Sequence, residues 1–186
     1  YTRSNMHISL DSALGQQRRL NQVGETISSI AAPTLAYSLR SLTGGDPKAV
    51  RVRRSSDDSE QDFTVSEINS GALVSFVGSG NDGFVATWYD QSGNGNNLTQ
   101  ATASNQPTIV TSGAINTRNS QPIIKFIQAN STVLHTANAN MMPTGSSLAV
   151  TIFHAMHIDA SSGNRIGVFG HNNGGNNAAT NKYRFG

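Results

Sequence analysis

Cysteine is absent from this chain of 186 residues, so neither a disulfide framework nor a thiolate metal site can form. Charged residues are scarce at 13%, and the formal net charge is only +2. So small a charge gives no general attraction to nucleic acid or to a membrane surface. No apolar run is long enough to cross a bilayer, so we expect no membrane insertion. These absences argue against disulfide-stapled, nucleic-acid-binding and membrane-spanning classes.

Hydrophobic residues make up only 36% of the chain, so uncharged polar residues and glycine account for much of the remainder. This balance favours a β protein with many turns over a helical bundle, whose exposed faces are rich in Lys and Glu. The length suits one domain with an appendage. The chain begins at Tyr1 rather than Met and ends at 183–186 in what reads as the start of a strand. We therefore expect a piece of a longer polypeptide, with a domain over 35–186 that is incomplete at its C-terminus.

Residues 1–34 are expected to form a helical lead-in to that domain. Four apolar residues recur there at three- and four-residue steps: Leu20, Val23, Ile27 and Ile30. The pattern predicts a helix over 9–30, which Pro33 would end. Two interpretations stay open: an oligomerisation or docking helix, or a helix packed on its own domain.

Strand patterns begin at Leu35. Residues 49–53 alternate, which places Val50 and Val52 on one face and two arginines on the other. An acidic run over 55–62 follows directly. We expect these opposite charges to neutralise one another locally rather than to form a basic stripe for nucleic acid.

Further short elements follow, separated by turn signals. A helical turn is predicted at 73–77, and strands at 84–89, 108–110, 122–126, 148–158 and 165–169. In the first of these strands Phe84, Ala86 and Trp88 are expected to share one face. In the fourth, His154 falls on the inward face with Met156, as a satisfied core or cleft residue or as a ligand. Short strands without a βαβ rhythm predict an all-β antiparallel sandwich, and the length fits a jelly roll.

The densest polar pattern lies in 88–98. Oxygen-bearing side chains occupy alternate positions there: Asp90, Ser92, Asn94 and Asn96. With Gly95 at a sharp turn they resemble the first half of a calcium loop, but Ala101 stands where a bidentate Glu is required. One interpretation is a weak calcium site at Asp90 and Asn94. The other is an Asx-type turn in which those two residues bond backbone N–H groups while Gly93 and Gly95 supply positive φ.

Catalytic machinery is not visible in the sequence. Glycoside hydrolysis requires two opposed carboxylates, and Asp90 lacks an obvious second member. The chain contains no Gly-x-Ser-x-Gly elbow, phosphate loop or His-x-x-x-His zinc pair. We therefore name no catalytic and no metal-binding residue, and expect a protein that is not an enzyme.

Residues 87–101 resemble the catalytic domain of family-54 α-L-arabinofuranosidases, a concanavalin A/laminin-G-like β-sandwich. With 36–40, 50–58 and 105–110, they are also similar to lectin-like jelly-roll modules of bacteriophage structural and tail-fibre proteins. The resemblance covers about 35–185 and implies a concanavalin A-like jelly roll. It does not carry hydrolase activity over. Where the enzymes have their nucleophile, the corresponding region 168–175 holds no carboxylate, and the family's vicinal cysteines are missing.

The resemblance implies a non-catalytic structural or carbohydrate-recognition module of a virion appendage or surface protein. Its partners would be other virion subunits, in a homo-oligomer, and host-surface glycans. The alternative is a secreted carbohydrate-binding or arabinofuranosidase-like domain. A sugar site is expected where aromatic and amide side chains converge: Trp88, Tyr89, His154, His171, Asn172 and Asn173. The alternative for Trp88 is a core residue.

Overall fold

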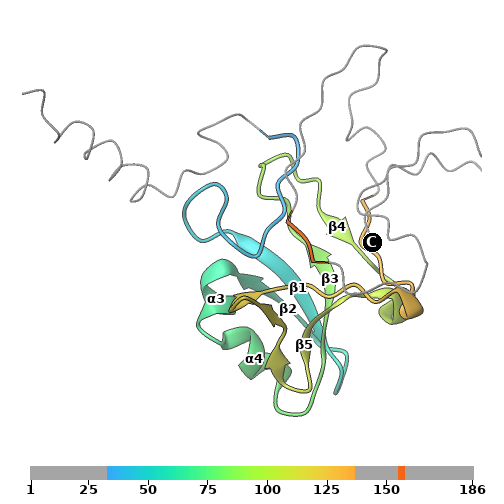
Figure 1. Cartoon of the computed structure of the whole chain (residues 1–186). Helices are drawn as coiled ribbons and strands as arrows, with labels where there is room; N and C mark the ends of the chain where they lie inside the picture. Colours follow the sequence, from blue (N-terminus) through green and yellow to red (C-terminus); the bar gives the residue numbers. More distant parts are fainter. Residues whose placement is uncertain (1–32, 137–154, 158–186) are drawn as a thin grey trace, which may run out of the picture.

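The computed structural model describes residues 33–136 and 155–157. Its main sheet is antiparallel, in the order β2-β1-β3-β5-β6, and β4 pairs with the end of β3 (Figure 1). The strands are β1 Lys48–Arg54, β2 Glu60–Thr64, β3 Gly83–Trp88, β4 Leu98–Thr99, β5 Thr108–Thr111 and β6 Ala114–Ile115. A separate hairpin joins β7 Thr117–Arg118 to β8 Gln121–Pro122. The predicted all-β antiparallel class is confirmed.

Strand β1 is an interior strand of the sheet, with β2 on one side and β3 on the other. Val50 and Val52 are fully buried and Arg51 is exposed, so the predicted alternation is confirmed. The acidic run neutralises the arginines as expected. Arg54 pairs with Asp57 at 2.6 Å.

Two short helices connect β2 to β3. Helix α3 (Val65–Asn69) begins with a capping box, in which the Thr64 hydroxyl accepts from the Glu67 N–H and the Glu67 carboxylate accepts from the Thr64 N–H. Helix α4 (Ala72–Val77) confirms the predicted helical turn and buries Leu73 and Val77. The two helices lie together at one side of the domain (Figure 1). No helix in the described ranges has the length and apolar character that a membrane span requires.

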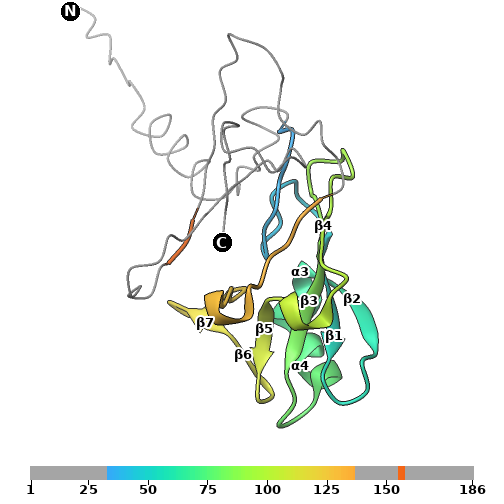
Figure 2. The same cartoon turned by 90° about the vertical axis from the view of Figure 1, so that its right-hand side faces the viewer.

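The core lies between the helices and the sheet. Its buried members are Leu39, Ala49, Val50, Val52, Phe63, Ile68, Leu73, Val77, Val85, Ile109 and Val110. Gly83 lies where this core is tightest. A Cβ there would fall 2.9 Å from Val77 Cγ2 and 3.2 Å from Val52 Cγ1, so only glycine fits without displacement. Strand β7 lies at the other side of the domain from β2 (Figure 2).

The expectation that Phe84, Ala86 and Trp88 share one face is wrong. Val85 is opposite Val52, Trp88 is opposite Val50, and the register shifts between these pairs. Because directly opposite residues face the same side, Val85 and Trp88 both face the core. Phe84 is opposite Arg53 and lies on the other face. A β-bulge, which adds one residue to a strand, is the cause of this reversal.

The predicted strand at 108–110 is confirmed as β5, whereas that at 122–126 is largely wrong. Only Pro122 lies in a strand. Ile123 donates to the carbonyl of Asn116, which lies in no strand, and Lys125 forms only an isolated bridge with Thr108 of β5. Of the strand predicted at 148–158, only 155–157 are described. They lie in no strand and Met156 is 45% exposed, so that part of the prediction is also wrong. The described residues supply no β-ladder partner for it. The predicted helix at 9–30 and strand at 165–169 lie outside the described residues.

Candidate functional site

Asp90 is the centre of the loop that follows β3. Its Oδ1 accepts from the N–H groups of Ala36 and Ser92, both at 2.9 Å. Its Oδ2 accepts from the Ser92 hydroxyl at 2.7 Å and from the Asn96 N–H at 3.0 Å. A carboxylate has about four acceptor positions. All of those on Asp90 are therefore occupied by donors from the chain itself.

This geometry is an Asx turn and does not suit calcium. A cation needs oxygen lone pairs, whereas hydrogen-bond donors converge on Asp90. Gly93 and Gly95 have φ of +88° and +72°, as the turn interpretation expects. Asn94 differs from the expectation, because its amide nitrogen donates to the backbone carbonyls of residues 33 and 34. Among the described residues, no group of three or more His, Asp or Glu side chains is placed to hold a metal.

Gln91 is a structural residue that the sequence reasoning missed. Its side chain is buried, and its Nε2 donates to the carbonyls of Ser38 and Arg40. Its Oε1 accepts from the Leu42 N–H at 2.8 Å, and its own N–H donates to the Ala36 carbonyl at 2.7 Å. One residue thus fastens the segment 36–42 to the end of β3. Nothing in the pattern distinguishes this glutamine from an exposed one.

Trp88 and Tyr37 form an aromatic pair beside the loop. Their ring centroids are 5.8 Å apart, and Trp88 packs partly buried against the core. The Tyr37 hydroxyl donates to the Asn96 carbonyl. Burial, and then the charge of Asp90, raise the pKa of Tyr37 above its usual value. Both rings therefore contribute to the attachment of the segment 36–42.

Tyr89 belongs to a charged cluster on the sheet. Its hydroxyl donates to Asp62 at 2.6 Å, and Asp62 also accepts from Arg51 at 2.6 Å and Lys48 at 2.7 Å. The hydrogen bond from Arg51, above all, holds the pKa of Asp62 well below its usual range. Burial, and then the hydrogen bond to Asp62, raise the pKa of Tyr89 to about 12. Tyr89, Arg51 and Lys48 thus all donate to the Asp62 carboxylate.

Of the six residues predicted to contact sugar, the structure describes only Trp88 and Tyr89. These two lie in the core-facing aromatic pair and in the charged cluster, not in a shared cleft. The other four, His154, His171, Asn172 and Asn173, lie outside the described residues.

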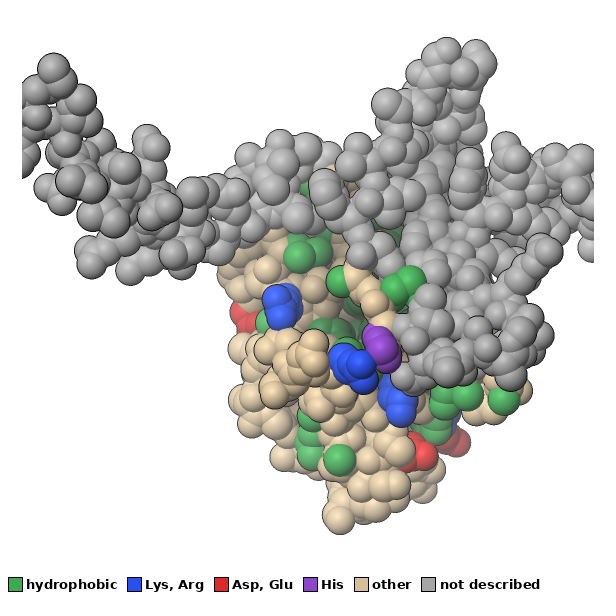
Figure 3. All heavy atoms as spheres, in the orientation of Figure 1, with side chains coloured by type: hydrophobic (Ala, Val, Ile, Leu, Met, Phe, Trp, Pro, Cys, Tyr) green, Lys and Arg blue, Asp and Glu red, His purple; other side chains and the backbone are tan. Residues whose placement is uncertain are grey.

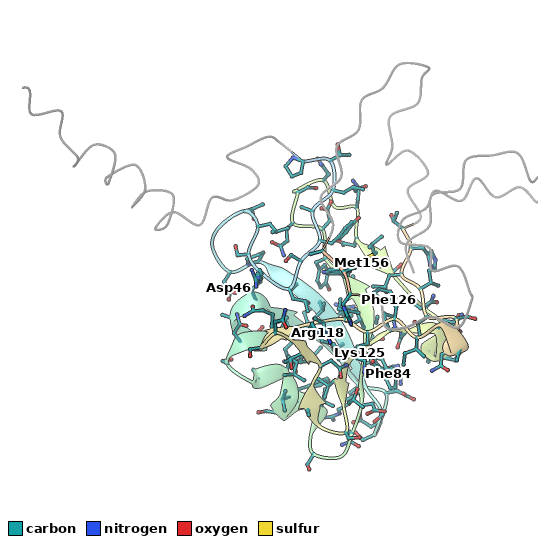
Figure 4. The ribbon with its side chains drawn as sticks, in the orientation of Figure 1. Asp46, Phe84, Arg118, Lys125, Phe126 and Met156 are labelled. Carbon is teal, nitrogen blue, oxygen red and sulfur yellow. The ribbon has the colours of Figure 1, made fainter. Side chains whose placement is uncertain are left out.

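A shallow open groove of about 600 Å³ lies away from the motif. Two 3₁₀ turns, η1 (Ala103–Asn105) and η2 (Gln128–Asn130), contribute to its walls. We call it the amide groove, and its lining includes Arg53, Phe84, Ser104, Asn105, Gln106, Ile127, Asn130 and Ser131. Phe84 is labelled near Lys125 and Phe126 in Figure 4. The sheet explains this proximity, since Phe84 is opposite Thr108 and Thr108 bridges to Lys125.

Three lining residues of the amide groove, Arg53, Phe84 and Gln106, contact one another. The Arg53 guanidinium lies 4.7 Å from the centroid of the Phe84 ring and donates from Nε to Gln106 Oε1 at 2.8 Å. The Gln106 amide in turn donates to the Gln100 carbonyl at 2.9 Å. The walls present exposed polar residues, among them Ser104 and Asn130. The lining of the groove thus combines the Phe84 ring, which Arg53 contacts, with hydroxyl and amide groups.

Charge is sparse on the described surface. Figure 3 shows a face on which uncharged polar groups and backbone predominate, with a few basic and acidic side chains and one histidine. Within the described ranges, four large apolar side chains are exposed: Phe126, Ile127, Val133 and Met156. Such a surface is suited to an uncharged polar ligand better than to a polyanion.

No protein-family model, curated protein or solved structure matched this chain.

Proposed function

We propose that this chain is a non-catalytic structural or carbohydrate-recognition module of a virion appendage or surface protein, with a concanavalin A-like jelly-roll architecture. The amide groove is the observation that supports recognition. Its volume of about 600 Å³ lies within the range of small-molecule sites, and its lining includes an aromatic ring, amides and hydroxyls.

A neutral sugar fits the chemistry of this groove. Sugars offer C–H faces that pack on apolar surface, and hydroxyl groups that both donate and accept. Phe84 and Ile127 supply apolar surface, and Asn130 adds an amide that can donate and accept. Arg53 contributes less as a ligand contact, because its side chain is only 12% exposed and already pairs with Asp58.

The described carboxylates support a non-catalytic role. A glycosidase needs a general acid whose pKa is raised. Wherever the pKa of a described carboxyl group is shifted, as for Asp46, Asp57 and Asp62, the shift is downward. Hydrogen bonds from Ser66, Arg54 and Arg51 are the main causes. These groups are stabilised as carboxylates and are poor proton donors at neutral pH.

The virion assignment rests on the resemblance of the motif blocks to phage modules. We propose other virion subunits as partners, in a homo-oligomer, and the virion as the location. The motif residues form their hydrogen bonds within the chain, and this supports the proposed structural role. Asp90 and Gln91 direct their hydrogen bonds to the chain itself, fixing the segment 36–42 on the sheet.

Glycan binding tests the recognition half. The whole chain is screened on a glycan array, and the ligand found is titrated by calorimetry against Phe84→Ala and Phe126→Ala. Phe84 lines the groove, whereas Phe126 is an exposed phenylalanine that does not. We expect Phe84→Ala to weaken binding about tenfold, the equivalent of one lost aromatic contact, and Phe126→Ala to retain it.

Two outcomes would count against this proposal. Absence of any glycan signal at millimolar concentration would leave only the structural role. Equal losses in the two variants would place the binding site outside the amide groove. Circular dichroism of both variants shows whether each is folded.

A further inference from the structure

The loop after β3 contains Asn94 directly followed by Gly95, and both residues are exposed. In such a pair the backbone nitrogen of the glycine can reach the side-chain carbonyl carbon of the asparagine, because glycine has no Cβ to obstruct it. No atom lies within 4 Å of the position that a Cβ on Gly95 would take. Of the asparagines in the described ranges, Asn94 alone precedes a glycine.

Asn94 also has a structural task. Its Nδ2 donates to the Pro33 carbonyl at 3.3 Å and to the Thr34 carbonyl at 3.1 Å. Neighbouring side chains supply longer bonds to the Thr34 carbonyl, from Ser92 at 3.2 Å and from Asn96 at 3.5 Å. The two bonds that Asn94 donates are long and exposed, so local opening that frees the Asn94 side chain costs little free energy.

We propose that Asn94 is a site of spontaneous deamidation, and that the reaction loosens the backbone of residues 33 and 34 from this loop. Hydroxide removes the Gly95 amide proton, and the nitrogen forms a bond to Cγ of Asn94. The Cγ–Nδ2 bond breaks and ammonia leaves, which gives a cyclic succinimide. Water then opens the ring at either carbonyl to yield aspartate or isoaspartate. The net reaction consumes one water and releases one ammonia, with no change in oxidation state.

The product reverses the polarity of the contact. A carboxylate only accepts, so it faces the carbonyls of Pro33 and Thr34 with no hydrogen to donate. It also adds a negative charge to a loop that already holds Asp90. The hydrogen bond from the Ala36 N–H to Asp90 involves no atom of Asn94 or Gly95, so it stays intact. The effect is therefore confined to the start of the described chain.

Peptide mapping tests the reaction. The whole chain is kept at 37 °C in mildly alkaline and mildly acidic buffer, digested, and sequenced by fragmentation in a mass spectrometer. We expect the conversion at Asn94 to exceed that at Asn96 and Asn97, and to be several-fold faster in the alkaline buffer. The variant Asn94→Gln should resist, because its longer side chain closes a less favourable ring. An unmodified Asn94 in a sample where Asn173, before Gly174, has reacted would overturn the proposal.

Hydrogen exchange tests the consequence. Asn94→Asp reproduces the charge of the product, and Asn94→Ser removes the donor without adding charge. The amides of residues 34 and 35 should exchange several-fold faster in Asn94→Asp than in the unmodified chain, with Asn94→Ser between them, whereas the Ala36 amide, bonded to Asp90, should be unchanged. Exchange in Asn94→Asp equal to that of the unmodified chain would show that deamidation leaves the attachment unchanged. Glycan binding is not involved, so failure here is independent of the proposed function.

Discussion

The loop after β3 and the amide groove are both rich in amides and hydroxyls, yet they use them in opposite ways. In the loop, Asp90 and Gln91 have their hydrogen-bonding capacity filled by the chain. In the groove, Asn130 and Ser131 are exposed on the rim. Saturation by internal hydrogen-bond partners, rather than the density of polar residues in the sequence, therefore separates a structural polar cluster from a candidate binding surface.

The two regions also differ in the kind of group that holds them together. The loop connects segments far apart in the chain, since Gln91 binds the backbone at residues 38, 40 and 42. The groove walls are formed by short 3₁₀ turns stabilised by neighbouring backbone bonds, such as Asn130 N–H to the Ile127 carbonyl at 3.1 Å. Substitutions in the loop should therefore reduce stability, and those on the groove rim should affect binding.

Asp90→Ala should give the largest effect. It removes the acceptor of three backbone N–H groups and a hydroxyl, so we expect a loss of about 3 kcal/mol in the free energy of unfolding. Asp82→Ala is the matched control, because the Asp82 carboxylate accepts from the Ser112 N–H alone and should cost about 1 kcal/mol. Urea denaturation measures both. Similar losses of unfolding free energy in the two variants would show that Asp90 stabilises the fold no more than a carboxylate with a single hydrogen bond.

The alternation in β1 and the helical spacing in α4 were sufficient to predict those elements, because each buries its apolar residues on one face. The glycines at 93 and 95 likewise indicated a turn with positive φ. The orientation of β3 was not predictable by alternation. A single bulge moves Val85 and Trp88 to the core face and leaves Phe84 on the other.

The groove could not be predicted from the sequence, for a different reason. Its walls come from two stretches, 103–106 and 127–132, neither of which has a periodic pattern. The fold joins them through the bond from the Val133 N–H to the Asn105 carbonyl at 3.0 Å. The role of Gln91 was hidden similarly, because its partners are backbone atoms that carry no residue-specific signal.

Acid should produce an intermediate effect through Asp62. Its pKa in the folded chain is below the unfolded value of about 3.9. The ionised form is therefore favoured by folding, and its contribution is complete at neutral pH and declines as the pH falls below about 4. Since Lys48 and Arg51 are largely exposed, we expect a contribution of about 1 kcal/mol.

The measurement compares unfolding of the unmodified chain and Asp62→Asn at neutral pH and near pH 3. The variant should start less stable and lose less on acidification. Asp58→Asn serves as the control, because Asp58 is 76% exposed and should contribute little. The same acid loss with and without Asp62 would assign the pH dependence to other carboxyl groups.

Asn130→Ala should give the smallest change in stability, within about 0.5 kcal/mol, because this exposed side chain lies on the groove rim. Asn69→Ala is the matched control, since Asn69 is also exposed but does not line the groove. Thermal unfolding should not separate the two variants, whereas titration with the glycan found on the array should show weaker binding only for Asn130→Ala. A loss of more than 1 kcal/mol in the free energy of unfolding of Asn130→Ala would contradict this expectation. It would mean that the polar groups of the groove, like those of the loop around Asp90, stabilise the fold.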